Sequence, residues 1–297
     1  MIVVAGSSNT DMVVKTNRFP QAGETILGGE FFMFSGGKGA NQAVAAARLG
    51  SKVAFISKTG NDIFGKQAVE GYKRESIDTR FIFTDEQLAS GTALITVNNE
   101  GQNTIVVAPG ANYSLNIDDI DKAGAVIDEA DIILVQLEIP LPVVEYVIGV
   151  AAKKSKRVIL NPAPAQLLAE KIYSQLYAIT PNETEAEILT GVKVTDRNSA
   201  AKAVKKFIER GMKNIIITMG QAGAYLYTNE FEGMIEAPVV KAVDTTAAGD
   251  VFNGSLAAAL EKGMQWEDAA SFACRAASVS VTKMGAQASA PFLHELV

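Results

Sequence analysis

The chain has 297 residues, of which 48% are hydrophobic and 20% are charged, a composition typical of a globular protein with one large core or two modest ones. Its formal net charge of −6 and its lack of a polybasic run argue against a nucleic-acid-binding protein. A single cysteine, Cys274, excludes an intramolecular disulfide, and with a single histidine, His294, it argues against a zinc cluster or a Ser-His-Asp triad.

The first fourteen residues, MIVVAGSSNTDMVV, contain no basic leader. They also contain no apolar run long enough for a signal peptide or a membrane span. A lone cysteine fits a reducing compartment. We therefore expect a cytoplasmic protein that has no membrane partner.

Two segments, residues 11–35 and 91–108, contain alternating strands and turns with little helical pattern. The second segment predicts a hairpin around the sequence NNEG at 98–101. No long linker or internal repeat separates them from the rest, so we expect one domain over residues 1–297 with a small β-sheet as an excursion. That sheet would serve as a lid, as a homodimer surface suggested by apolar alternation at 12–14 and 92–97, or as both.

A glycine cluster, FSGGKGANQAVAAARLG, spans residues 34–50. It is not a P-loop, because Gly39 follows Lys38 where Ser or Thr is needed and Met33 stands in place of the upstream glycine. It is not a dinucleotide fingerprint either, because Gln42 replaces the third glycine. Glycines that let backbone approach a ligand, with Lys38 and Asn41 as donors, suit a polyol such as a sugar; a glycine-rich helix start with an exposed lysine is the structural alternative.

Short apolar, β-branched runs alternate with amphipathic segments along the rest of the chain. They lie at 53–57, 131–138, 157–162, 178–183 and 214–220. Near-continuous apolar strands separated by helices are typical of a parallel sheet covered on both faces. The pattern therefore predicts an α/β fold, doubly wound, with a mainly parallel central sheet flanked by helices.

Residues 243–260, VDTTAAGDVFNGSLAAAL, place small residues and Asp250 at the start of a helical pattern. A helix N-terminus offers unpaired N–H groups, and Ala247, Ala248 and Gly249 are small enough for an anion to reach them. Asp250 at the edge of such an anion hole would accept a proton from an alcohol, which points to phosphoryl transfer to a hydroxyl. Helix capping by Asp250 is the commoner role of an aspartate in this position.

The sequences GGKGANQAVAAARLG and DTTAAGDVFNG resemble the two signatures of the ribokinase-like, or PfkB, carbohydrate kinase family. Five further segments, SSNTDMVV, FPQAGET, LNPAPA, TPNETEAEILTG and VTKMGAQAS, are similar to segments of family members that phosphorylate D-ribose. The general signature has a glycine where this chain has Ala247, and the form Ala-Ala-Gly-Asp favours the same members. The resemblance implies a ribokinase-like fold with a small β-sheet lid.

The resemblance also implies a sugar site built from three segments and Asp250. Its residues would be Asn9, Thr10 and Asp11 at the end of the first strand, Gly37, Lys38, Gly39, Ala40 and Asn41 in the glycine cluster, and Glu138 after the strand at 131–138. Buried polar groups of this kind reject analogues that leave them unpaired. From the residues alone, Asn9 and Asp11 also suit a turn, and Glu138 suits a surface position before Pro140.

On the nucleotide side, the resemblance implies that Asn182 and Glu185, an N-x-x-E motif, act near Mg²⁺ and the phosphates through water. ATP would also contact a further set of residues: Thr218, Met219, Gly220, Gln221, Ala222, Gly223, Gly249, Asp250 and Cys274. Local alternatives remain for three of them. Asn182 and Glu185 suit a capping box, and Cys274 suits a small buried position on a helix.

A site for a monovalent cation is the last implied feature. By similarity, K⁺ would be held largely through backbone oxygens of Asp244, Thr246, Ser280, Lys283, Gly285 and Ser289. Its loop adjoins the anion hole, so a bound cation would order those amides. Asp244 alone would also suit the end of a strand.

The implied reaction is in-line transfer of the ATP γ-phosphoryl group to the 5-hydroxyl of D-ribose, with Asp250 as general base, residues 247–249 as anion hole and Mg²⁺ bridging the phosphates. The alternatives are a kinase for 2-deoxyribose, fructose or adenosine, and a non-catalytic sugar-binding regulator on the same fold. Asn9, a donor suited to an extra hydroxyl, argues against 2-deoxyribose. The retained Asp250, anion hole and Asn182 argue against a regulator.

Overall fold

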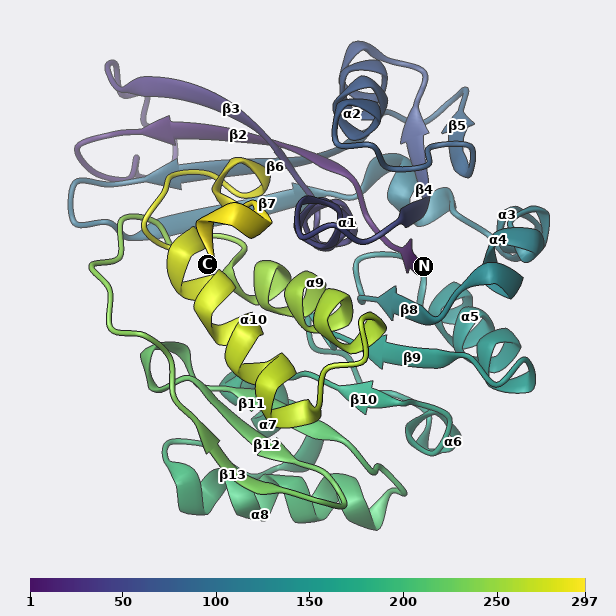
Figure 1. Ribbon diagram of the computed structural model, residues 1–297. Helices are drawn as coiled ribbons and strands as arrows, with labels where there is room; N and C mark the ends of the chain where they lie inside the picture. The colour runs from purple at the N-terminus through teal and green to yellow at the C-terminus, as the bar shows by residue number, and fades with distance from the viewer. Residues whose placement is uncertain (297) are drawn as a thin grey trace.

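The computed structural model describes residues 1–296. It contains a nine-stranded central sheet flanked by helices and a separate four-stranded sheet that projects from one side (Figure 1). The expected fold class, α/β with a mainly parallel central sheet, is confirmed.

The strands are β1 (Ile2–Ala5), β2 (Asn9–Lys15), β3 (Glu30–Gly36), β4 (Val53–Gly60), β5 (Ile82–Asp85), β6 (Gly91–Val97), β7 (Asn103–Ala108), β8 (Ile132–Val135), β9 (Arg157–Leu160), β10 (Ala178–Ile179), β11 (Ile215–Thr218), β12 (Ala224–Tyr227) and β13 (Glu232–Ile235). The α-helices are α1 (Lys38–Arg48), α2 (Ile63–Arg74), α3 (Ile117–Lys122), α4 (Gly124–Glu129), α5 (Leu141–Lys153), α6 (Glu170–Tyr173), α7 (Glu183–Thr190), α8 (Arg197–Glu209), α9 (Ala248–Glu261) and α10 (Trp266–Ser280).

The central sheet has the order β13-β12-β11-β10-β9-β8-β1-β4-β5. Every pair from β11 to β5 is parallel, whereas β12 and β13 extend the sheet as antiparallel strands. The strand order reverses between β1 and β8, because the chain builds outward from β1 to β5 and then returns to β8. In open α/β sheets, ligands bind at the carboxyl ends of the strands next to such a reversal.

Alternate residues of the buried strands enter two separate hydrophobic cores, as the two-residue period of a strand requires. Val3 and Ala5 pack with residues of α3, α4, α5, α7 and α8 on one face. Ile2 and Val4 pack with residues of α1, α9 and α10 on the other. The sheet is thus covered on both sides, which explains why its strands are apolar throughout.

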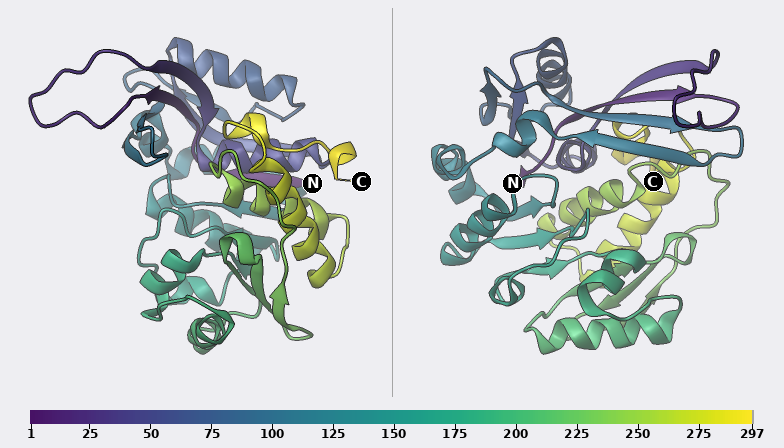
Figure 2. Two further views of the ribbon diagram at one scale, coloured as in Figure 1. Left: turned by 90° about the vertical axis from the view of Figure 1, so that its left-hand side faces the viewer. Right: turned by 180° about the vertical axis from the view of Figure 1, so that it is seen from behind.

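The small sheet has the order β3-β2-β6-β7 and matches the two predicted excursions in the chain. Strands β6 and β7 form the predicted hairpin, in which the Asn98 amide donates to the Gln102 carbonyl at 3.0 Å and Gly101 has φ = 77°. Figure 2 shows the connection between β2 and β3 reaching well away from the body. In residues 1–296, no helix is long and apolar enough to cross a membrane.

Candidate active site

The sugar-side residues gather at the carboxyl ends of β1 and β8. Glu138, three residues after β8, accepts hydrogen bonds from the Ser7 hydroxyl at 2.5 Å and from the Lys38 amide at 3.0 Å. This pairing joins the first turn of α1 to the loops after both strands. Glu138 is therefore a structural part of the site and not the surface residue of the alternative interpretation.

Asn9 and Asp11 lie differently from the prediction. They do not end β1, which stops at Ala5; they begin β2 of the small sheet. The Asn9 Oδ1 accepts a hydrogen bond at 2.8 Å from Asn112, a fully buried amide that also holds the backbone of Ser8. Because Asn112 occupies this oxygen, the side-chain nitrogen of Asn9, Nδ2, is the atom left to donate to a ligand. Asn112 belongs to no motif, and the sequence analysis missed it.

The Asp11 carboxylate lies directly over Gly36, where an added Cβ would come within 2.1 Å of it. Burial, together with Glu138 and Asp250, raises the pKa of Asp11 to about 7, although Lys38 opposes the shift. Lys38 has the complementary environment. Burial alone would lower the pKa of its ammonium group, but Asp250, Glu138, Glu185 and Asp11 raise it above the ordinary value. One half-buried lysine thus lies close to several carboxylates.

Replacement of Asp11 by Asn should make the protein more stable at pH 8. Because its folded-state pKa of about 7 exceeds the ordinary value of 3.8, folding takes up a proton between these values. The cost of burying the ionised carboxylate grows as the pH rises through this window and is complete above it. We expect Tm of Asp11→Asn to exceed that of the unsubstituted chain by about 3 °C at pH 8. The difference should shrink toward pH 5, as measured by calorimetry, and an equal difference at both pH values would contradict it.

Asp250 is buried in the first turn of α9. Its Oδ2 accepts a hydrogen bond from Asn41 Nδ2 at 2.8 Å, and its Oδ1 accepts one from Gln42 Nε2 at 3.1 Å. Burial raises the pKa of Asp250 above its ordinary value, while Lys38 and the two amide donors oppose the shift. The carboxylate does not cap its helix: the N-cap residue is Ala247, and no side chain bonds the first-turn amides there. The capping alternative for Asp250 is therefore wrong.

The start of α9 presents open amides. Ala247 has φ = 59°, an uncommon left-handed conformation for a residue with a Cβ. Within residues 1–296 the amides of Ala247 and Gly249 find no acceptor, whereas that of Ala248 donates to the Thr245 carbonyl at 3.3 Å. A Cβ on Gly249 would meet nothing within 4 Å, so the space before this turn is clear. Unpaired amides at a helix start favour an anion.

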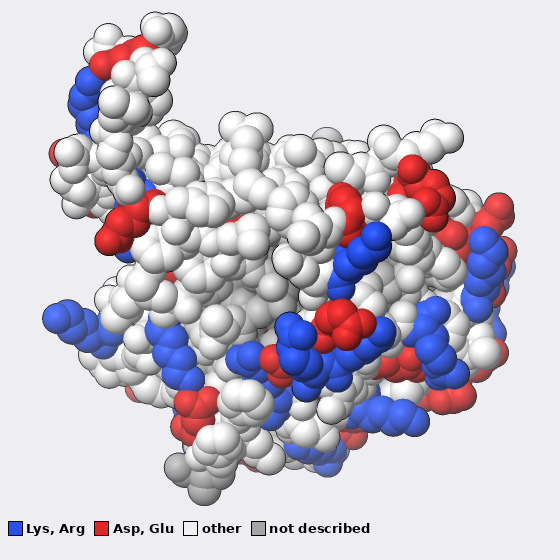
Figure 3. Space-filling view, turned by 90° about the horizontal axis from the view of Figure 1, so that it is seen from above, with Lys and Arg blue, Asp and Glu red and all other residues white. Residues whose placement is uncertain are grey.

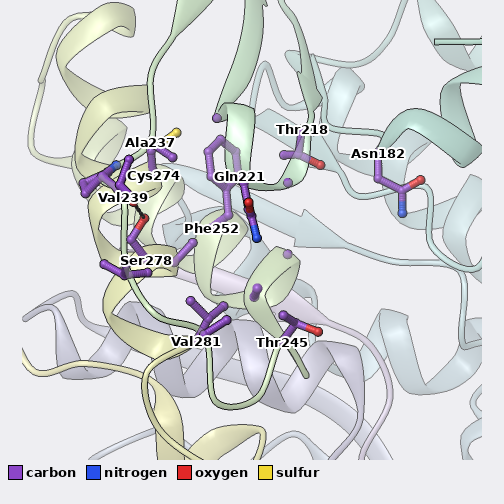
Figure 4. A pocket seen from close by; sticks show the side chains of 18 of the residues that line it. Asn182, Thr218, Gln221, Ala237, Val239, Thr245, Phe252, Cys274, Ser278 and Val281 are labelled. Atoms are coloured by element: carbon purple, nitrogen blue, oxygen red, sulfur yellow. Dashed lines mark hydrogen bonds between the residues drawn. The ribbon is translucent and has the colours of Figure 1, made fainter. Parts of the chain in front are cut away.

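A cavity of about 520 Å³ opens beside this helix start (Figure 4). Several residues predicted for the nucleotide line it: Asn182, Thr218, Gly220, Gln221, Gly223, Gly249 and Cys274, together with Ala248 of the predicted anion hole. Cys274 and Ser278 of α10 lie on one side of it, and Asn182 and Thr218 lie on the other. Burial raises the pKa of the Cys274 thiol to about 12, so the thiol stays protonated and is not a nucleophile. Its role is to line the cavity.

Other predicted residues lie elsewhere. The Met219 side chain packs in one of the hydrophobic cores, and Met219, Ala222 and Ala247 are not among the residues that line the cavity. A further part of the cavity wall was not predicted from the sequence. It consists of Ala237, Pro238, Val239, Val240 and Ala242 with Phe252, Ala277 and Val281. In the sequence this part of the wall corresponds to the short apolar run APVV at 237–240, which belongs to no motif.

Asn182 and Glu185 form the capping box of α7. The Asn182 Oδ1 accepts from the Glu185 amide at 2.8 Å, and the Glu185 carboxylate accepts from the Asn182 amide at 2.9 Å. The local alternative is thus realised, yet Asn182 also lines the cavity. Burial raises the pKa of Glu185. The charge of Asp250 raises it further, and the charge of Lys38 opposes the shift. Among residues 1–296, no three acidic, histidine or cysteine side chains gather as a metal site.

The residues predicted for K⁺ lie in two segments that Asp244 joins, the loop before α9 and residues 280–289 from the end of α10 onward. Its Oδ1 accepts from the Thr246 amide and its Oδ2 from the Gly285 amide, both at 2.9 Å. The hydroxyls of Ser280 and Ser289 bond to carbonyls in their own turns, and the Lys283 ammonium pairs with Glu295. The two serine hydroxyls and the lysine are therefore engaged elsewhere, and a cation between the segments would depend on backbone oxygens.

Known proteins resemble this chain along almost its entire length. The family described as pfkB family carbohydrate kinase matches residues 1–293. The chain is 45% identical to a ribokinase of Haemophilus influenzae over 99% of its own length and 96% of the relative's. It is 38% identical to a deoxyribokinase of Salmonella typhi, with the same coverage of both chains.

A solved structure of Arabidopsis thaliana ribokinase complexed with ribose and ATP has the same fold. It superimposes with a TM-score of 0.91 at 30% identity and covers 99% of this chain and 96% of its own. A family match over almost the entire chain and relatives of this identity lead to one conclusion. The chain belongs to the pfkB family of carbohydrate kinases.

Proposed function

We propose that this chain transfers the γ-phosphoryl group of ATP to the 5-hydroxyl of D-ribose. The observation that carries the proposal is the position of Asp250. It is a buried carboxylate that contacts Asn41 of the sugar-side cluster, and it directly follows Gly249, which lines the 520 Å³ cavity. A base in this position can take the proton of a hydroxyl while the open amides before it receive the transferred group.

The sugar-side cluster suits a polyol. The Asn41 Oδ1 is buried and, within residues 1–296, has no hydrogen-bond partner, although its Nδ2 is held by Asp250. A buried acceptor without a partner is costly, and a ligand hydroxyl would satisfy it. The nitrogen of Asn9 and the carboxylate of Asp11 add a donor and an acceptor at the same strand ends. Thr10 and residues 37–40 would border the sugar through their backbone.

The cavity is large enough for a nucleotide, since pockets for ligands of this size measure about 300–1,000 Å³. The positive φ of Gly220, with nothing within 4 Å of an added Cβ, lets the backbone turn close to a bound base or sugar. Mg²⁺, when bound, neutralises charge on the phosphates. Asn182 and Glu185 would hold it through water, because two such residues do not make a direct cage.

We further propose a K⁺ site between the segments that Asp244 joins. Burial would raise the pKa of Asp244, but hydrogen bonds from the Thr246 side chain and from the Gly285 and Thr246 amides lower it below its ordinary value. A negative charge is therefore held between the segments. The cation would order the turn that begins α9, three residues further along the chain.

A single buried cysteine supports a reducing location, the cytoplasm.

A homodimer through the small sheet is also proposed. The strand registers place Met33, Met12, Leu94 and Val106 in one row across the sheet, and three of the four are largely exposed. In Figure 3 the arm that projects from the molecule carries both acidic and basic groups, whereas the face next to it shows few charged groups. An apolar row of this kind is usually covered by a partner. Sedimentation at working concentration tests it, and a monomer would remove the proposal.

The test of the proposed function is ADP release with ATP and Mg²⁺ in the presence of D-ribose, 2-deoxyribose, fructose or adenosine. Each is assayed with K⁺ and with tetramethylammonium in its place. We expect D-ribose to give the highest kcat/KM and K⁺ to raise it, with the K⁺ response lost in Asp244→Ala. Preference for 2-deoxyribose would keep the kinase mechanism but overturn the interpretation of Asn9. Binding of D-ribose without turnover of any substrate would favour the non-catalytic regulator.

A further inference from the structure

A chain of buried amides contacts Asp250, and none of its members is among the residues that line the cavity. Gln42 of α1 is its centre and has no exposed surface. The Nε2 of Gln42 donates to Asp250 Oδ1 and to Asn161 Oδ1, each at 3.1 Å. Its Oε1 accepts from Gln136 Nε2 at 2.7 Å. The partners come from separate elements, since Asn161 follows β9 and Gln136 follows β8.

Only one orientation of the Gln42 amide satisfies these groups. Asn161 Nδ2 donates to the backbone carbonyl of Thr180 at 3.3 Å, and a carbonyl can only accept. Asn161 must therefore present its oxygen to Gln42, and Gln42 must present its nitrogen to Asn161 and to Asp250. Both protons of this nitrogen are used, so the side chain cannot turn over without breaking two bonds. The orientation is thus determined by the backbone carbonyl of Thr180, directly after β10.

The two amides that hold Asp250 have different roles in the site. Asn41 bonds Oδ2 but keeps its own buried oxygen without a partner in residues 1–296, which suits a group that also meets a ligand. Gln42 bonds Oδ1, and all its hydrogen-bonding groups face protein. Gln42 therefore has the contacts of a support, and Asn41 has those of a ligand-binding residue.

We propose that Gln42 is a positioning residue that, oriented by Asn161, orients the Asp250 carboxylate and favours its ionised form. The proposal rests on the assignment of Asp250 as base in the proposed function. Rotation about the last bond of an aspartate is only weakly restricted, so one donor on each oxygen is what defines the carboxylate plane. A hydrogen bond to a carboxylate also favours the charged form, the form that accepts a proton.

The same chain reaches the anion hole. The Thr180 hydroxyl donates to Asn253 Oδ1 at 2.6 Å, and Asn253 Nδ2 donates to the Gly249 carbonyl at 2.8 Å. Thr180 is thus linked both to Asn161, which holds Gln42, and to the first turn of α9. The base and the turn that carries the open amides share one buried framework, which preorganises them together.

The test compares Gln42→Met with Gln136→Met, a matched loss of a fully buried amide that does not touch Asp250. We expect both variants to lose stability. Only Gln42→Met should lower kcat about tenfold with little change in the KM for ATP and D-ribose. The acid limb of its pH–kcat profile should move upward by about one pH unit, because Asp250 loses a hydrogen-bond donor that lowers its pKa. The other charged groups near Asp250 stay in place: Glu138 after β8, Asp11 on β2, Glu185 on α7 and Lys38 on α1.

A variant that reverses the hydrogen-bond polarity sharpens the test. Gln42→Glu puts a second carboxyl group beside Asp250, so the acid limb should move further up than in Gln42→Met. If Gln42→Met does not fold, Asn161→Ala removes the group that orients Gln42 and should shift the limb in the same direction by a smaller amount. Equal effects of the Gln42 and Gln136 variants on kcat and on the acid limb would overturn the proposal.

A double variant separates this proposal from the function on which it rests. If Gln42 acts through Asp250, then Gln42→Met should cause no further loss of kcat in an Asp250→Asn background. An additional tenfold loss there would overturn the positioning role. High activity of Asp250→Asn alone would instead overturn the assignment of the base, whatever Gln42 does.

Discussion

Replacement of Asp250 by Asn should lower kcat by about 10³-fold, the middle of the range of about 10²–10⁴-fold that general-base catalysis contributes. The substitution keeps the size of the side chain but removes the group that accepts the substrate proton. The KM for ATP should change little, because the cavity lining and the open amides of Ala247 and Gly249 remain. Steady-state kinetics with saturating ATP and varied D-ribose would measure both effects.

The variant has one structural cost that a control must separate. Asn41 and Gln42 each donate to a different oxygen of Asp250, so an asparagine there must turn its own NH₂ toward one of these donors. Removal of a buried charge offsets part of that cost, and we expect Tm to remain within a few degrees. Asp250→Glu, which keeps the carboxylate but displaces it, should recover part of the activity without recovering the geometry. An Asp250→Asn variant within tenfold of the original kcat would exclude Asp250 as the base.

The contacts of Asp250 could not be predicted from the residues around it in the sequence. Its position before a helical pattern favoured a cap, whereas its carboxylate bonds side chains of α1 more than 200 residues earlier in the chain. Capping preference is a local property, and a contact between two helices that pack on the same face of the sheet can override it. Asn182 and Glu185 are the opposite case. Their capping box lies within four residues, and the sequence alone predicted it.

The parallel strands were predictable because each is an apolar run between helical segments. The residues at which these strands end were less predictable. The predicted strand at 178–183 is only the two residues of β10, because Pro181 lacks an amide and Asn182 begins the turn of a capping box. The antiparallel pair β12 and β13 had no place in the predicted alternation of strands and helices.

The supports of the site were beyond the sequence for a different reason. Gln42, Gln136 and Asn161 lie in unrelated segments, and a lone glutamine or asparagine carries no signal of its own. They meet only because β8 and β9 are neighbours and α1 crosses their carboxyl ends. Asn112 behind Asn9 and the cavity wall at 237–242 are similar cases. Motifs thus predicted candidate ligand-binding residues, whereas only the fold showed which side chains hold them in place.

Gly39→Ala should damage both the fold and the reaction, because α1 approaches β1 through a contact between two glycines. A Cβ on Gly39 would lie 2.7 Å from the Cα and carbonyl carbon of Gly6 and from the Ser7 amide nitrogen. These are backbone atoms, so no rotamer change can relieve the clash. The helix must move, even though alanine is by itself the better helix former. We expect Tm to fall by about 5 °C or more.

The same displacement should lower kcat/KM about 100-fold, since a shift of about 1 Å in positioning groups can have that effect. The first turns of α1 supply the amide of Lys38 to Glu138 and the side chains of Asn41 and Gln42 to Asp250. Gly149→Ala is the matched control. It makes the same change within α5, where the nearest atom to an added Cβ is 4.0 Å away, and should leave activity unchanged while Tm holds or rises. If Gly39→Ala behaves like this control, the close approach of α1 to β1 does not determine the geometry of the base. A selective loss would instead mean that two facing glycines set the distance at which the sugar-side donors meet Asp250.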